Sequence, residues 1–111
     1  MMATRWKDSN GRRWAASINL ADVGRIRRTY NVDLLDGRAL AKLADDPMVL
    51  VGVLWELHSG EAEAAGIEPE AFADGLRGDA LERAADAVGR ELADLARCQA
   101  EAIEKMCRAR Q

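Results

Sequence analysis

Few side chains in this sequence have the type and spacing needed for chemistry. The one histidine, His58, follows an apolar stretch and stands three residues before Glu61. A metal site needs three or four ligands, and Cys98 and Cys107 lack the spacing of metal-binding cysteines. We therefore expect no metal, and we expect His58 to lie at the end of a helix, where it bonds to backbone carbonyls.

The nucleophiles and glycines of the sequence form no catalytic or cofactor-binding motif. Ser59 is next to His58 in sequence only, which is not the geometry of a catalytic triad, and no serine lies in a nucleophile elbow. The glycines form neither the dinucleotide-binding nor the Walker-type phosphate loop. The sequence therefore predicts no catalytic residues and no cofactor, and a protein that is not an enzyme.

The two cysteines fall in one predicted helix, on opposite faces, so they should not pair with each other. We interpret them as ordinary thiols of a reducing compartment, and we expect a cytoplasmic protein. The start of the chain does not resemble a signal peptide, and no apolar run is long enough to span a membrane. A membrane is therefore not an expected partner.

Length and composition fit one small domain, but the charges are unevenly placed. The chain has 111 residues, 49% of them hydrophobic, and a formal net charge of −3. Residues 1–28 carry seven basic and two acidic side chains, whereas the remainder carries nine basic and seventeen acidic ones. We call residues 1–28 the basic head. It could contact an anionic partner or a second copy, or it could be a solvated surface.

The segment Thr4–Ile18 predicts a β-hairpin. A two-residue turn would place Trp6 opposite Ala15, whereas a three-residue loop at Ser9-Asn10-Gly11 pairs Trp6 with Trp14. We favour the second register because it lets both indoles pack on one side. An isolated hairpin is marginal in water, so this one should pack on helices or extend a neighbour's sheet.

Helix signals follow the hairpin. Asn19 is suited to cap a first helix of about three turns that stops at Asn31. Asp36 is suited to cap a short second helix. That second helix would include Leu40 and Leu43.

The next signals predict three more helices. Asp46 and Pro47 are typical of the start of a helix, which could end at Gly60 or continue to Gly66. Pro69 begins another helix, with Phe72 and Leu76 directed inward. Asp79 opens an amphipathic helix of about thirty residues, whose apolar positions are Leu81, Ala84 or Ala85, Val88, Leu92 and Leu95, and more weakly Ala102 and Met106.

These elements predict a mainly α fold, a small helical domain of about five helices with an N-terminal β-hairpin. We expect a single domain over 1–111, with the hairpin at 4–18, a helical body at 19–96 and a C-terminal helix extension at 97–111.

The sequence predicts more apolar helical surface than five short elements can obviously cover. The helix Met48–Leu57 has almost no polar face, so it is either central in the core or incompletely covered in the monomer. Excess apolar face is typical of a protein partner or of self-association, and we expect a homo-oligomer. The candidate protein-binding residues are Leu50, Val53, Leu54, Leu57, Val88 and Leu92.

A family resemblance is carried by the order and spacing of several short pieces between Gly11 and Leu95. They are NGRRW at residues 10–14, Val32-Asp33-Leu34, Asp46-Pro47 before Leu50, Val53 and Leu54, Gly66-Ile67 before Phe72, and the Ala-rich amphipathic helix Gly78–Leu95. This pattern resembles the tail assembly chaperones of long-tailed bacteriophages and the related proteins of tail-like gene-transfer particles. The chain after Ala96 falls outside the resemblance.

The resemblance implies a function and a set of partners. Such phage or prophage chaperones coat the long helical tape-measure protein during tail morphogenesis and leave it as tail-tube subunits polymerise. The family is associated with α-helical folds and with self-association into rings or filaments, needs no cofactor, and would act in the host cell cytoplasm.

An alternative is a small nucleic-acid-binding or regulatory protein that uses the basic head. It would use Arg12, Arg13, Arg27 and Arg28, with exposed tryptophans stacking on bases. Because no recognition-helix motif is visible and the rest of the chain is acidic, nucleic acid is not the partner we expect.

Overall fold

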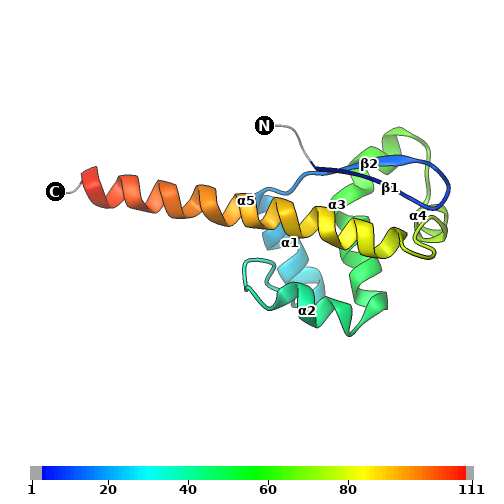
Figure 1. Cartoon of the computed structure of the whole chain (residues 1–111), viewed down its shortest axis with the longest axis horizontal. Coiled ribbons are helices and arrows are strands. Elements are labelled where there is room, and N and C mark those ends of the chain that lie inside the picture. Colours follow the sequence, from blue (N-terminus) through cyan, green and yellow to red (C-terminus); the bar gives the residue numbers. More distant parts are fainter. Residues whose placement is uncertain (1–3, 110–111) are drawn as a thin grey trace.

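A two-stranded hairpin and five helices make up the described part of the chain, residues 4–109, in this computed structural model (Figure 1). The fold is mainly helical, as predicted. The ends of the domain predicted over 1–111, residues 1–3 and 110–111, lie outside the described residues.

The hairpin has the three-residue loop that the sequence favours. Strand β1 (Thr4–Lys7) pairs antiparallel with β2 (Arg13–Ala16), and Trp6 lies opposite Trp14. Gly11 adopts φ +83°, the left-handed conformation that this loop requires. Both indoles are therefore on one face, and that face is buried against the helices.

The first two helices are short. Helix α1 (Leu20–Tyr30) begins with a capping box formed by Asn19 and Asp22, and it ends at Asn31, which has φ 56°. Helix α2 (Ala39–Ala44) starts two residues later than a cap at Asp36 would give. The Asp36 carboxylate instead accepts a hydrogen bond from the Arg38 N–H (3.0 Å), so it stabilises the turn before the helix rather than the helix itself.

Helix α3 (Pro47–Ala64) is the centre of the fold. The Asp46 side chain accepts from the Val49 N–H (3.4 Å), and Pro47 occupies the first helical position, as predicted. The helix passes through Gly60 and ends before Gly66, which takes φ +73°. Of the two predicted ends, the later one is therefore correct.

Helix α4 (Pro69–Asp74) and helix α5 (Ala80–Ala109) complete the chain. Phe72 is buried, as is Leu76 just beyond α4. Helix α5 has the predicted thirty residues. Figure 1 shows its first half running beside the hairpin, whereas its last turns (orange to red) extend beyond every other element.

The core lies where α3 meets the hairpin. Helices α1, α2 and α4 and strand β2 pack on α3, and both strands pack on α5. Within residues 4–109, no helix joins sufficient length to sufficient hydropathy to cross a lipid bilayer. The buried rings of Trp6, Trp14 and Phe72 contact His58, and the partly buried Trp55 packs on Phe72.

Candidate functional site

The fold encloses most of the residues predicted to bind a protein partner. Leu50, Val53 and Leu54 point into the core because α3 is covered by three helices and a strand, and α5 adds Val88 and Leu92 to the same core. In this fold these side chains, apart from the partly exposed Leu57, pack in the core and form no accessible surface. Leu50, Val53, Leu54, Val88 and Leu92 are at most 8% exposed, and Leu57 is half-buried.

Accessible apolar surface lies instead on the last turns of α5. We call residues 96–109 the arm. Ile103 and Met106 are 60% and 59% exposed there. The row of apolar side chains that is buried at Val88 and Leu92 thus continues along α5 onto the arm, where it is exposed. The sequence indicated this continuation at Met106 but gave it less weight than the enclosed part.

A hollow of about 250 Å³ lies where the arm leaves the body. The loop after α1 contributes Leu34 and Leu35, and α5 contributes Leu92, Ala93 and Ala96. Leu35 is itself 39% exposed. Apolar side chains from two segments therefore meet at the base of the arm.

His58 lies within a helix and in the core, not at a helix end. Its Nε2 accepts a hydrogen bond from Trp6 Nε1 (3.1 Å), and its Nδ1 donates to the Leu54 carbonyl (2.7 Å). These partners assign the proton to Nδ1. Burial lowers the pKa of His58, outweighing the Leu54 carbonyl and the charge of Glu61, which both raise it. The imidazole is therefore a neutral structural group near pH 7.

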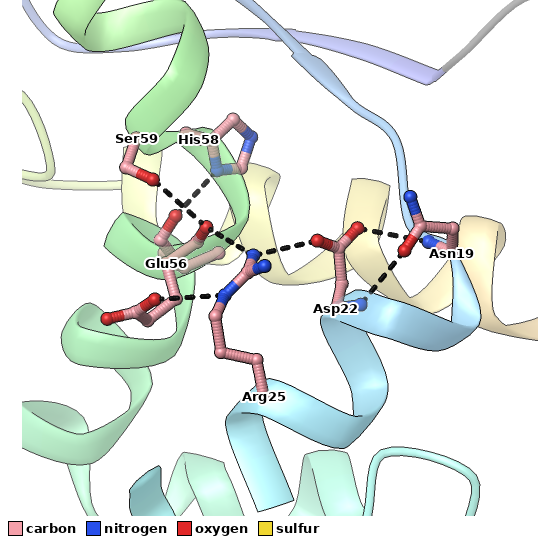
Figure 2. Close-up of polar contacts among 7 residues, drawn as sticks. Asn19, Asp22, Arg25, Glu56, His58 and Ser59 are labelled. Carbon is pink, nitrogen blue, oxygen red and sulfur yellow. Dashed lines mark hydrogen bonds and ion pairs between the residues drawn. The ribbon is translucent and has the colours of Figure 1, made fainter. Parts of the chain in front are cut away.

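Ser59 does not act with His58. Its hydroxyl donates to the Glu56 carbonyl (3.3 Å), and Figure 2 shows that this bond does not involve the imidazole. The same view shows Arg25 in an ion pair with Asp22 of its own helix α1 (2.7 Å) and in a second one with Glu56 (3.3 Å), which joins α1 to α3.

Asp8 anchors the hairpin loop from inside. Its Oδ1 accepts from the N–H groups of Asn10 and Arg12 (2.9 Å each), and its Oδ2 accepts from Trp14 Nε1 (3.0 Å). The side chain is buried against Gly75, whose carbonyl accepts from the Ser9 N–H (2.8 Å). This close approach fixes the loop to the end of α4.

The four arginines that the nucleic-acid alternative would use come from two separate elements. Arg12 and Arg13 lie on the hairpin, whereas Arg27 and Arg28 lie on α1, which packs on α3. The hairpin tryptophans are at most 6% exposed, so they do not offer a stacking platform for bases. The basic side chains that α5 brings beside the hairpin, Arg83 and Arg90, were missed, and their spacing of two helical turns was the available signal.

Among residues 4–109, no three His, Cys, Asp or Glu side chains gather as a metal site would require. Cys98 and Cys107 are both exposed free thiols on the arm.

No family model, curated protein or solved structure matches this chain. What it does must therefore be inferred from its own surfaces.

Proposed function

We propose that this protein is a non-enzymatic binding protein whose arm holds an apolar helix of another polypeptide. The observation that carries the proposal is the exposure of Ile103 and Met106 on a helix that extends past its own body (Figure 1). An isolated helix of this length is marginal in water, so contact with a partner would stabilise it.

Helical geometry favours a helical partner. Met106 follows Ile103 by three residues, so the two side chains lie on neighbouring positions of one face. The arm rises about 21 Å, enough for about four turns of a second helix to pack alongside. The apolar hollow that includes Leu35 and Leu92 lies at the base of the arm, where such a helix could continue onto the body.

The tail assembly chaperone is the specific form of this function that we propose. The order of the Val32-Asp33-Leu34, Asp46-Pro47 and Gly66-Ile67 pieces supports it, and the partner would then be a helical tape-measure protein in the host cell cytoplasm. A tail-tube gene upstream and a very long tape-measure gene downstream of the coding sequence would agree with this identity. Neighbours unrelated to phage tails would contradict it.

The binding test uses a helical fragment of the neighbouring tape-measure protein and isothermal titration calorimetry. We expect the double substitution I103D/M106D to weaken binding at least about tenfold, because two apolar side chains lose their burial. Both residues are more than half exposed, so the fold should persist. Met48→Asp, at a 79% exposed methionine on α3, is the matched control and should change nothing.

Two results would contradict the proposal. Unchanged affinity of I103D/M106D would place the partner elsewhere. Light scattering across a concentration series would detect the other occupant, a second copy of the chain. A dimer that I103D/M106D dissociates would show that the arm serves self-association.

A further inference from the structure

A basic face covers the outer side of the hairpin and the adjoining turns of α5. Side chains alternate between the two faces of each strand. Because Trp6 and Trp14 point inward, the residues on either side of each tryptophan point outward. Five exposed cations form this basic face: Arg5, Lys7, Arg13, Arg83 and Arg90.

Backbone geometry holds these cations close together. Lys7 lies directly opposite Arg13, and Arg5 is two strand positions from Lys7, about 7 Å along β1. Arg83 Nε donates to the Lys7 carbonyl (3.0 Å), which joins helix to strand. Arg90 follows Arg83 by two helical turns, about 10.5 Å along the same face of α5.

Two adjoining hollows connect the strand cations to the helix cations. One is lined by Arg5, Trp6, Lys7 and Arg13. The other shares Arg5 and Trp6 with it and continues to Thr4, Arg83, Asp86, Ala87 and Arg90. The basic face is therefore one continuous surface and not five separate side chains.

None of these five cations forms an ion pair with a carboxylate within residues 4–109. Within residues 4–109, the arginines that form ion pairs are others, on α1, before α2, after α4 and on the arm. Asp86 lines the hollow that contains Arg83 and Arg90. Two further carboxylates lie at the edge of the face: Glu91 accepts from the Thr4 N–H (2.6 Å), and Glu61 accepts from the Ala15 N–H (3.2 Å) and lines a hollow with Arg13.

The chemistry of the face distinguishes between two kinds of anionic partner. A stable protein interface usually has an apolar or aromatic centre, whereas nucleic-acid interfaces are polar and strongly positive. The strongly exposed large apolar side chains lie outside the basic face: Leu20, Leu35, Met48, Ile103 and Met106. With both hairpin indoles buried, the face also has no platform for unpaired bases.

We propose that the basic face binds the phosphate backbone of double-stranded nucleic acid without reading its sequence. This goes beyond the proposed function of the arm and is independent of it. At 100° per residue, Met106 lies about 160° and Ile103 about 140° around the α5 axis from Arg90, so the two surfaces face opposite ways. Both could be occupied at once.

The test is fluorescence anisotropy of a short random-sequence DNA duplex titrated with the full chain. If the five cations each neutralise one phosphate, the logarithm of the affinity should fall with the logarithm of salt concentration with a slope of about −4.5. The affinity then falls about 500-fold between about 50 and 200 mM salt. No binding by the folded protein at about 50 mM salt would overturn the proposal.

Matched variants locate the binding. The double substitution R5Q/R13Q should reduce the steepness of the slope by about 1.8 and weaken binding about 60-fold at about 0.1 M salt. R27Q/R28Q removes the same charge from α1 and should leave the slope unchanged. Equal effects of the two variants would mean that net charge, not this face, determines binding.

A third variant removes a negative charge from the face instead of positive ones. Asp86→Asn removes the carboxylate from the hollow and should tighten binding several-fold, whereas unchanged or weaker binding would place the duplex elsewhere.

Polyglutamate competition tests the other class of partner: tighter binding of polyglutamate than of the duplex would assign the face to an acidic polypeptide and overturn the proposal. The arm variant I103D/M106D should bind DNA normally, so the two proposals can fail separately.

Discussion

Replacing Asp8 with asparagine should destabilise the fold through one buried hydrogen bond. The side chain is 3% exposed and uses both carboxylate oxygens, Oδ1 for two backbone N–H groups and Oδ2 for Trp14 Nε1. Asparagine can keep its oxygen on the backbone donors only if its NH₂ group faces the indole N–H. The flipped amide would leave the backbone donors without their acceptor.

The magnitude follows from what is lost. A hydrogen bond to a charged acceptor contributes about 1.5–3 kcal/mol, and an unsatisfied buried donor costs about 1–3 kcal/mol. We expect Asp8→Asn to lower the free energy of unfolding by about 2 kcal/mol, and Asp8→Ala to lower it by about 3–4 kcal/mol because all three bonds are lost. Either loss is a large fraction of the roughly 5–15 kcal/mol of a typical domain.

Urea unfolding followed by far-UV circular dichroism measures this loss without relying on the tryptophans at the site. Asp33→Asn is the control, since Asp33 is exposed and accepts from the Leu35 N–H (3.0 Å) on the surface. It should change the free energy by less than about 0.5 kcal/mol.

A double-mutant cycle isolates the buried bond. Trp14→Phe removes the Nε1 donor, so Asp8→Asn should cost about 1–2 kcal/mol less in that background. If the two effects add to within about 0.5 kcal/mol, the hydrogen bond between these side chains contributes nothing and the reasoning is refuted.

Three further predictions concern stability. Gly60→Ala should raise the free energy of unfolding by about 0.5–1 kcal/mol, because a Cβ there meets nothing within 4 Å inside α3. Gly75→Ala should lower it by about 1–3 kcal/mol, since its Cβ would lie 2.5 Å from Asp8 Oδ2; urea midpoints that move the other way would contradict either prediction. The lowered pKa of His58 means that the unfolded chain takes up a proton below about pH 6.5 while the folded chain stays neutral, so stability is full above that pH and should fall by up to about 1.4 kcal/mol per unit as pH decreases. His58→Gln should flatten this dependence, and an equally steep curve for that variant would assign it to other groups.

The sequence predicted those features of the fold that depend on residues close together in the chain. The register of Trp6 and Trp14 followed from placing both indoles on one face of a short hairpin, and the ends of α1 followed from Asn19 and Asn31. These features depend on residues close in sequence, so a single sequence contains the information.

The rest depended on contacts between distant segments. Whether Leu54 is covered or exposed depends on how four elements pack around α3, which periodicity does not determine. His58 was placed at a helix end because Gly60 resembled a stop, but the tertiary fold carries α3 through that glycine. The basic face was missed because it joins residues as far apart as Lys7 and Arg83.

The hydrogen bonds that hold β1 have a consequence for the order of events during synthesis. Thr4 bonds to Glu91 across 87 residues, and the Lys7 carbonyl bonds to Arg83 across 76. At a translation rate of about 5–20 residues per second, Glu91 is synthesised about 4–17 s after Thr4. During that interval Trp6 and Trp14 lack their final packing, so the nascent chain offers chaperones and proteases a target that the finished protein conceals.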